Sequence, residues 1–162
     1  MQDGTRRNIS RSKGKGHSPK GTILLVEDNS DDVELTIRAL KRNGIINNIV
    51  TLRDGVQALD YLQKRGPYEQ STDEYPALVL LDLKLPRIDG LELLGQIKAD
   101  PNLKTLPVIM LTSSKQERDV SRAYQLGVNS YICKPTDFSE FVDLIGTLGR
   151  YWFSCVELPA PT

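Results

Sequence analysis

Short apolar segments that end on a polar side chain recur through the sequence and constrain its fold. The clearest one runs from Ala77 to Leu81 and passes directly into Asp82. A strand without alternating polar residues is typical of a parallel sheet that is covered on both faces. The other segments are Ile23–Val26 before Glu27 and Asp28, Val108–Leu111 before Thr112, and Ser130–Cys133 before Lys134.

Helical patterns separate these segments, and one further strand, at 47–51, is more polar, as suits the edge of a sheet. Five strands that alternate with five helices predict an α/β fold with a parallel sheet and right-handed crossovers. In the order 2-1-3-4-5, the first and third strands are neighbours at the topological switch point. We expect strands at 22–26, 47–51, 77–82, 107–111 and 129–133, and helices at 30–43, 55–65, 90–99, 115–126 and 137–151.

The polar residues at the strand ends should meet at one edge of this sheet. Glu27, Asp28 and Asp82 would contribute carboxylates, Thr112 a hydroxyl and Lys134 an ammonium group. Ligands of open α/β sheets bind outside the carboxyl ends of the strands, and Mg²⁺ prefers oxygen ligands. The pattern suits a divalent-metal site where an aspartate accepts a phosphoryl group. Alternatively, Glu27 and Asp28 are acids favoured by the dipole of the following helix.

The charge of the chain is unevenly distributed. Residues 1–20 contain six basic residues and one acid, whereas the whole chain has 21 of each sign. Rich in Gly, Ser, Lys and Arg, this segment is predicted to be a disordered tail, or alternatively a basic arm that contacts an acidic partner. Residues 21–152 form the predicted folded domain and 153–162 a C-terminal tail. The mildly acidic remainder disfavours nucleic acid as the main partner.

Several classes of protein are disfavoured by simple counts. Two cysteines, Cys133 and Cys155, do not make a disulfide framework. No stretch is long and apolar enough for a membrane span or a signal peptide, so we expect a soluble, cytoplasmic protein without membrane association. The only histidine, His17, lies in the N-terminal tail, which disfavours Ser-His, Cys-His and His-metal chemistry.

Five motifs follow one another along residues 21–150. They are Leu25-Val26-Glu27-Asp28-Asn29, Asp54-Gly55 with Ala58-Leu59, Leu81-Asp82 with Pro86 and Asp89-Gly90, Leu111-Thr112-Ser113, and Lys134-Pro135. With these motifs in this order, the sequence resembles the response-regulator receiver domain, the CheY-like fold of two-component signalling. The long loop before residue 77 and the tail from Tyr151 resemble, more narrowly, the single-domain regulators that partner phytochrome-type histidine kinases.

This resemblance implies a response regulator that accepts a phosphoryl group from a histidine kinase on Asp82. Mg²⁺ would be bound by Glu27, Asp28, Asp82 and the backbone carbonyl of Lys84. The protein would not be an enzyme for other substrates, because it catalyses only its own phosphoryl transfer and dephosphorylation.

The resemblance also assigns roles around the phosphoryl group. Thr112 and Lys134 would bind it, Tyr131 would act as an aromatic switch, and Lys84 and Ser114 would tune the site. Thr112 could alternatively be an ordinary capping residue, and Lys134 a solvated lysine. In this family the Lys-Pro bond is usually cis, so a cis bond is implied before Pro135.

Output is expected through protein–protein contact, because the residues after 152 are too few for a DNA-binding module. The predicted surface comprises the helix at 115–126, the strand at 129–133 and the helix at 137–151. The partners would be a downstream protein or a phosphotransfer protein in a phosphorelay. The aromatic run Tyr151–Phe153 suggests a homodimer through this surface. Alternatively, the tail folds back and seals the core of its own domain.

Two rival functions use the same residues. A haloacid-dehalogenase-type phosphatase also carries an aspartate at a strand end, but it needs a second acid where Lys84 stands. A receiver-like adaptor that is never phosphorylated is the other alternative. The set of three acids with Thr112 and Lys134 argues against the adaptor.

Overall fold

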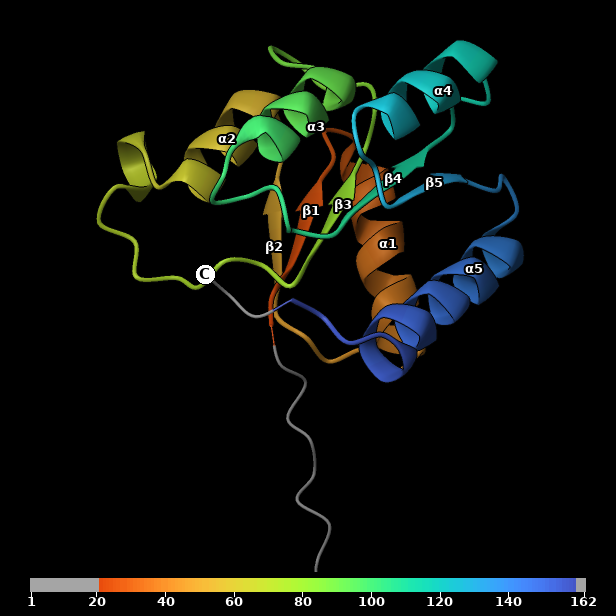
Figure 1. Cartoon of the computed structure of the whole chain (residues 1–162). Helices are drawn as coiled ribbons and strands as arrows, with labels where there is room; N and C mark the ends of the chain where they lie inside the picture. The colour runs from red at the N-terminus through yellow and green to blue at the C-terminus, as the bar shows by residue number, and fades with distance from the viewer. Residues whose placement is uncertain (1–20, 160–162) are drawn as a thin grey trace, which may run out of the picture.

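The computed structural model describes residues 21–159, which fold into one parallel sheet between two layers of helices (Figure 1). The strand order is β2-β1-β3-β4-β5, and all neighbours are parallel, which confirms the predicted topology. The strands are β1 (Ile23–Val26), β2 (Ile49–Leu52), β3 (Leu78–Leu81), β4 (Val108–Thr112) and β5 (Ser130–Cys133). The helices are α1 (Ser30–Arg42), α2 (Gly55–Gln63), α3 (Gly90–Ala99), α4 (Glu117–Gln125) and α5 (Phe138–Arg150).

The strands are apolar along their length because the sheet buries both of its faces. In β1, Leu24 and Val26 belong to the core beneath α2, α3 and α4, whereas Ile23 and Leu25 belong to the core beneath α1 and α5 (Figure 1). All four residues are buried. Successive side chains of a strand point to opposite faces, so a strand covered twice needs apolar residues at every position.

Three element ends differ from the prediction by two residues, and the other differences are of one residue. Strand β2 begins at Ile49, since the buried Asn47 instead donates through Nδ2 to the Gly21 carbonyl at 2.9 Å. Helix α2 ends at Gln63, because Lys64 adopts left-handed backbone at φ 54°. Helix α4 begins at Glu117 rather than at residue 115.

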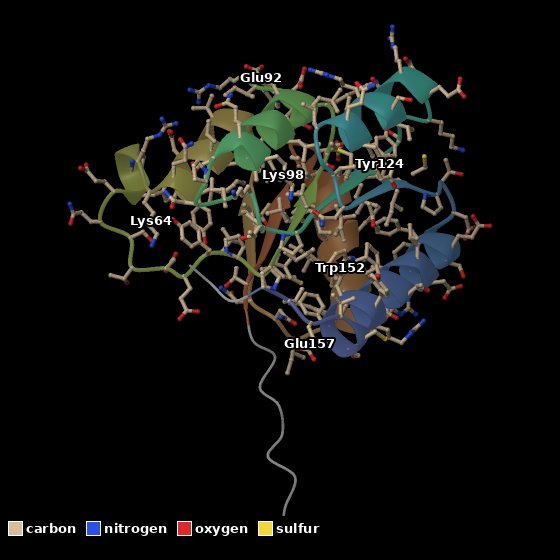
Figure 2. The ribbon with its side chains drawn as sticks, viewed as in Figure 1. Lys64, Glu92, Lys98, Tyr124, Trp152 and Glu157 are labelled. Atoms are coloured by element: carbon tan, nitrogen blue, oxygen red, sulfur yellow. The ribbon has the colours of Figure 1, made fainter. Side chains whose placement is uncertain are left out.

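Residues 151–159 fold back across the amino edge of the sheet, where the strands begin (Figure 1). A π-helical turn, η2 (Tyr151–Cys155), continues from α5, and a short 3₁₀ helix, η1 (Gly66–Tyr68), interrupts the predicted loop before β3. The sequence pattern indicated neither. The tail residues that pack with the core beneath α1 and α5 are Trp152, which is buried (Figure 2), Phe153, Val156 and Leu158.

Helix α1 is joined to α5 by a contact between residues far apart in the sequence. The Asn43 side chain donates through Nδ2 to the carbonyls of Ala39, at 2.8 Å, and Val142, at 3.0 Å. Gly146 of α5 allows this approach, because a Cβ there would overlap the Asn43 side chain. The layer formed by α1 and α5 therefore depends on residues 99 positions apart.

None of the helices within residues 21–159 is both long and apolar enough to cross a lipid bilayer. The predicted tail at 1–20 and the last three residues lie outside the described residues.

Helix α3 begins so close to the end of β3 that only glycine fits at its first position. A Cβ at Gly90 would overlap the carbonyl oxygen of Asp82 and lie 2.7 Å from the Cα of Leu83. We expect Gly90→Ala to lower the free energy of unfolding by about 1–3 kcal/mol, since backbone must move to admit the methyl group. Urea denaturation of the purified protein measures this difference.

Gly95 of the same helix provides the control. A Cβ there meets only the end of the Leu126 side chain, at 3.4 Å. Gly95→Ala should therefore leave stability unchanged or raise it by up to about 1 kcal/mol through better helix propensity. Equal loss of stability in both variants would show that the close approach at Gly90 has no special cost.

Candidate metal centre

Three carboxylates meet at the carboxyl edge of the sheet, where the strands end. Glu27 and Asp28 follow β1, Asp82 follows β3, and the two strands are paired so that Val26 lies opposite Leu81. One carboxylate oxygen from each acid lies within 4.8 Å of the others. Glu27 is buried, Asp28 is exposed, and the Asp82 side chain is 12% exposed. The predicted acidic cluster is therefore present, with one side open to solvent.

Backbone contacts hold this edge in place. The N–H of Asp82 donates to the Val26 carbonyl at 3.0 Å, which continues the β1–β3 pairing beyond the strands. The N–H of Asn29 donates to Oε1 of Glu27 at 3.1 Å. The Asn29 side chain caps α1 by accepting from the N–H groups of Asp31 and Asp32. The turn that carries Glu27 is thus fixed by the start of the helix.

The ammonium group of Lys134 lies among the acids, as the sequence predicted. Its Nζ is 2.6 Å from Oε2 of Glu27, 3.3 Å from Oδ2 of Asp32 and 3.8 Å from Oδ2 of Asp82. The side chain is only 12% exposed. The N–H of Lys134 donates to the carbonyl of Thr112 at 2.8 Å, so the end of β5 is tied to the end of β4.

The titration of this cluster follows from its burial. Burial raises the pKa of Glu27 to about 7, opposed by the hydrogen bond from Lys134 and assisted by the negative charge of Asp82. For Lys134, burial acts to lower the pKa, but the hydrogen bond with Glu27 and the charges of Asp82, Glu27 and Asp32 together raise it above its usual value. Lys134 therefore stays positively charged at neutral pH.

The donor set fits a divalent cation. Three carboxylates supply oxygen ligands and three negative charges, and Lys134 offsets only one of them. In proteins, Mg²⁺ is bound by one or two carboxylates together with several waters. Because Asp28 is exposed, waters can reach the site from its side. The predicted fourth ligand, the carbonyl of Lys84, stays a prediction.

Two further predicted residues, Thr112 and Lys84, differ in their exposure to solvent. Thr112, at the end of β4, is buried, and its Oγ1 accepts a hydrogen bond from the N–H of Ser114 at 3.3 Å. Lys84 is exposed, and its side chain forms no ion pair within residues 21–159. The predicted tuning role of Lys84 thus depends on a side chain that extends into solvent.

Tyr131 and Ser114 form a network with α4. The Tyr131 hydroxyl donates to the Ser114 carbonyl at 2.9 Å, and the Ser114 hydroxyl donates to Oδ2 of Asp119 at 2.6 Å. The N–H of Tyr131 donates to the hydroxyl of Tyr124, a residue of the last turn of α4 (Figure 2). Burial raises the pKa of Tyr131, so its hydroxyl remains a donor at neutral pH. Tyr131 thus contacts α4 and the loop before it.

The cis bond implied before Pro135 is wrong for this structure, in which residues 21–159 contain no cis peptide bond. The trans isomer is intrinsically favoured for an X-Pro bond. Lys134 nevertheless lies within ion-pair distance of Asp82, so its inward position does not need the cis isomer.

Asp32, in the first turn of α1, was not among the predicted site residues, although it contacts Lys134. As one of two adjacent acids at a helix start, it looked like an ordinary dipole-favoured residue. A signal was nevertheless present: Asp32 is spaced by four, seven and eight residues from the buried Thr36, Ala39 and Leu40. It therefore lies on the inward stripe of the helix, whereas Asp31 does not.

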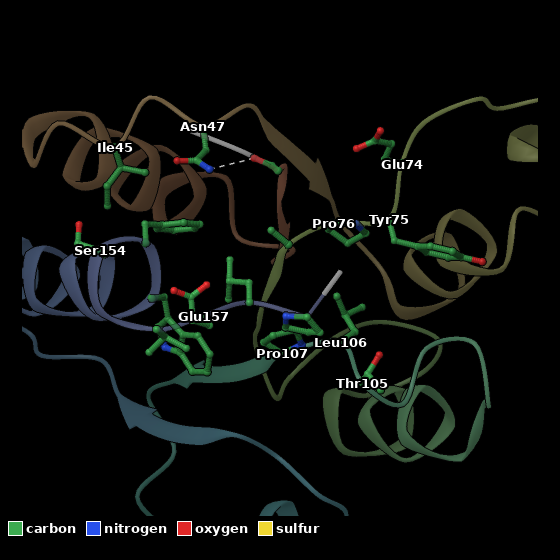
Figure 3. A pocket seen from close by; sticks show the side chains of 18 of the residues that line it. Ile45, Asn47, Glu74, Tyr75, Pro76, Thr105, Leu106, Pro107, Ser154 and Glu157 are labelled. Atoms are coloured by element: carbon green, nitrogen blue, oxygen red, sulfur yellow. Dashed lines mark hydrogen bonds between the residues drawn. The ribbon is translucent and has the colours of Figure 1, made fainter. Parts of the chain in front are cut away.

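A pocket of about 850 Å³ lies at the opposite, amino edge of the sheet, between the C-terminal tail and the loops before β2, β3 and β4 (Figure 3). Ile45, Tyr75, Leu106 and Trp152 are among its lining residues. None of the acids of the metal centre lines it. The pocket is therefore separate from the metal centre at the carboxyl edge.

Comparison with known proteins places this fold and site in a family context. The family model of the response regulator receiver domain matches residues 23–146. The response regulator Rcp1 of Synechocystis sp. is 41% identical over 143 residues, which cover 88% of this chain and 96% of Rcp1. The probable methanogenesis regulatory protein FilR2 of Methanothrix harundinacea is 42% identical over 139 residues, which cover 86% of this chain and 88% of FilR2.

Solved structures agree with these sequence relationships. The phosphorylated cyanobacterial phytochrome response regulator RcpA has a TM-score of 0.81 and 40% identity, over 86% of this chain and 99% of RcpA. The Mn²⁺-bound form of Rcp1 has a TM-score of 0.81 and 41% identity, over 87% of this chain and all of Rcp1.

Proposed function

Because this chain belongs to the response-regulator receiver family, we propose that Asp82 accepts a phosphoryl group from a histidine kinase while Glu27, Asp28 and Asp82 hold Mg²⁺. The meeting of three carboxylates with Lys134 at the carboxyl edge supports this function. Two relatives add support, since RcpA has been solved in phosphorylated form and Rcp1 with Mn²⁺. RcpA is a phytochrome response regulator, which favours a phytochrome-type kinase as the phosphodonor of this chain.

In the proposed reaction, a carboxylate oxygen of Asp82 attacks the phosphorus of a phosphohistidine. A P–O bond forms as the P–N bond breaks, and the imidazole nitrogen keeps the electron pair and takes up a proton. Glu27, Asp28 and Asp82 would hold Mg²⁺, which would supply positive charge to neutralise the transferring phosphoryl oxygens. Lys134 supplies the protein's own cation, and the hydroxyl of Thr112 donates to a phosphoryl oxygen. The chemistry is confined to Asp82 itself, so the protein is not an enzyme for separate substrates.

The switch in this proposal is Tyr131 with the surface formed by α4, β5 and α5. Moving a two-state equilibrium from 1:99 to 99:1 takes about 5.5 kcal/mol. One or two charge-assisted hydrogen bonds, made by Thr112 and Lys134 at about 1.5–3 kcal/mol each, approach that value. Tyr131 contacts Ser114 and Tyr124 and so joins the site to α4. Lys84 and Ser114 would tune the lifetime of the phosphorylated state.

Labelling by a small phosphodonor tests this function directly. The full chain is incubated with acetyl phosphate and Mg²⁺, and its intact mass is followed over time. We expect the gain of one phosphoryl group, which EDTA suppresses. A chain that stays unmodified at saturating Mg²⁺ would instead be the adaptor that is never phosphorylated.

Mg²⁺ binding should depend on pH because of Glu27. The pKa of Glu27 is raised to about 7, so below that pH it carries a proton in the folded protein, and a metal requires the carboxylate. We expect the Mg²⁺ affinity to be constant above about pH 8 and to fall by up to about tenfold per unit of pH below 7. Calorimetric Mg²⁺ titrations at a series of pH values measure this slope.

The raised pKa of Glu27 also determines whether the stability of the fold rises or falls with pH. The folded pKa lies above the usual value of 4.5, so the folded state binds more protons between the two values. Without metal, the Glu27 contribution to stability should therefore decrease as the pH rises from 4.5 to about 7.

Glu27→Gln is the control for the Mg²⁺ titrations. This variant should bind Mg²⁺ more weakly than the wild type, and its Mg²⁺ affinity should not fall between about pH 8 and 6 as that of the wild type does. A wild-type affinity independent of pH between about 5.5 and 8 would contradict the assignment.

The surface formed by α4, β5 and α5 is also the proposed interface with a downstream protein or a second copy. Tyr124 (53% exposed), Phe138 (36%) and Tyr151 (54%) are large exposed apolar residues on or next to its helices. Exposed apolar residues commonly mark interfaces, and two-fold dimers are the commonest oligomers. We expect light scattering to detect a dimer at high micromolar concentration. A monomer in both phosphorylation states would exclude the homodimer.

A further inference from the structure

Asp32 is an acid beside Lys134 for which the proposed reaction has no role. Its Oδ2 lies 3.3 Å from Nζ of Lys134, closer than Oδ2 of Asp82 at 3.8 Å. The Lys134 side chain is 12% exposed and that of Asp32 is 40% exposed, so the pair is only partly screened by water. Glu27, at 2.6 Å, completes the surroundings of the ammonium group.

The backbone of Asp32 is held in place on both sides. Its N–H donates to Oδ1 of Asn29 at 3.1 Å, and its carbonyl accepts from the hydroxyl of the buried Thr36 at 2.8 Å. Asn29 is also the residue whose N–H binds Glu27. The two carboxylates nearest to Lys134 are therefore delivered by one rigid turn at the start of α1.

A count of donors shows what this arrangement does to Lys134. An ammonium group has three N–H donors, and three carboxylates surround it. Those of Glu27 and Asp32 lie within hydrogen-bond distance, but that of Asp82 does not. The cation is therefore hydrogen-bonded to the two carboxylates at the start of α1, whereas its contact with the proposed phosphoacceptor is only a longer ion pair.

We propose that Asp32 is a positioning residue that holds the Lys134 ammonium off Asp82 in the resting protein. The Asp82 carboxylate is then left open to a divalent cation, and the same contact opposes retention of a phosphoryl group, which needs Lys134 for itself. The inference builds on the proposed function of Asp82.

Removal of the Asp32 charge should act in opposite directions on cations and anions. Freed from Asp32, the ammonium group moves toward Asp82, where it competes with Mg²⁺ and becomes available to a phosphoryl group. A variant that merely loosened the site would bind both more weakly. A lower affinity for the cation together with a higher affinity for the anion therefore distinguishes a positioning role of Asp32 from a structural one.

The variants for the test are Asp32→Asn and, as matched control, Asp31→Asn. Asp31 is the preceding residue of α1, is exposed and has no contact with Lys134, so the control makes the same charge change at the same helix start. The probes are Mg²⁺ alone and, at saturating Mg²⁺, beryllium fluoride, which takes the place of a phosphoryl group on a carboxylate. Amide NMR shifts follow both titrations.

We expect Asp32→Asn to lower the Mg²⁺ affinity and to raise the beryllium fluoride affinity, each by about threefold to tenfold. Asp31→Asn should change either affinity by less than about twofold. If Asp32→Asn weakens both probes, or behaves like Asp31→Asn, the positioning role is overturned.

A double variant tests whether Asp32 acts through Lys134. In a Lys134→Gln background, Asp32→Asn should change the Mg²⁺ affinity no more than Asp31→Asn does in the wild type. A full effect without Lys134 would mean that Asp32 acts by its charge alone, and would overturn the proposal. If the wild-type protein binds Mg²⁺ but does not bind beryllium fluoride, the proposed function is refuted. The Mg²⁺ titrations of the variants would still decide the role of Asp32.

Discussion

Asp82→Asn should abolish phosphorylation by acetyl phosphate and by a histidine kinase, at any Mg²⁺ concentration. An amide lacks the anionic oxygen that attacks phosphorus, and Asp82 is the carboxylate that follows β3 at the carboxyl edge. The fold should persist, because the backbone N–H of Asp82, which bonds to Val26, is unchanged. Intact-mass spectrometry after incubation with the phosphodonor measures the loss.

The stability of this variant provides a second measurement. Asp82 contributes negative charge that raises the pKa of Glu27, so its neutralisation relieves repulsion within the cluster. The melting temperature without metal should therefore not fall. A clear drop would show that the ion pair between Lys134 and Asp82 outweighs the repulsion between the acids.

Asp89→Asn is the matched control for Asp82→Asn. Asp89 lies in the same loop, where its side chain caps α3 by accepting from the N–H of Glu92 at 2.9 Å. Asparagine caps helices about as well as aspartate. This variant should therefore keep both its stability and its phosphorylation. Label on the Asp82→Asn protein would show that another residue is the phosphoacceptor.

Asp28→Ala should weaken Mg²⁺ binding by about a hundredfold to a thousandfold. A carboxylate about 4 Å from a divalent cation interacts with it by about 2 kcal/mol in bulk water and about 8 kcal/mol near a protein surface, and for the exposed Asp28 we expect a loss of about 3–4 kcal/mol. Asp28 is exposed, so its truncation removes no core packing. Calorimetric titration with Mg²⁺ measures the loss.

Asp31→Ala serves here as the control, because Asp31 is also exposed and lies three residues further along the chain. It should bind Mg²⁺ almost as the wild type does. High Mg²⁺ should restore part of the phosphorylation of Asp28→Ala but none of that of Asp82→Asn, because only the former keeps the phosphoacceptor. An unchanged Mg²⁺ affinity in Asp28→Ala would remove Asp28 from the metal site.

The sheet and the acidic cluster could be predicted from the sequence because both follow from apolar strands that end on polar residues. Unbroken apolar runs such as Leu78–Leu81 require burial on two faces, and the order of the strands then places Glu27 and Asp28 beside Asp82. The position of Lys134 followed from the same topology, since β5 ends at the same edge.

The remaining contacts depend on how side chains from distant elements meet. Nothing near Asp32 in the sequence specifies Lys134, which lies 102 residues away. The bond from the N–H of Tyr131 to Tyr124 likewise needs the exact placement of α4 against the edge strand β5. The turn at Tyr151–Cys155 forms where the tail packs on the core beneath α1 and α5, and helical periodicity carries no information about such packing.

The pairing of α1 with α5 has a consequence for how the chain folds as it is synthesised. Asn43 donates to the carbonyl of Val142, so this contact between α1 and α5 cannot form until α5 has left the ribosome. Contacts of such long sequence separation also slow folding, because the intervening loop must be closed before they form. The nascent chain therefore exposes the part of α1 that α5 covers until α5 has been made. Trp152 and Leu158, which follow α5 in the chain, complete this side of the core.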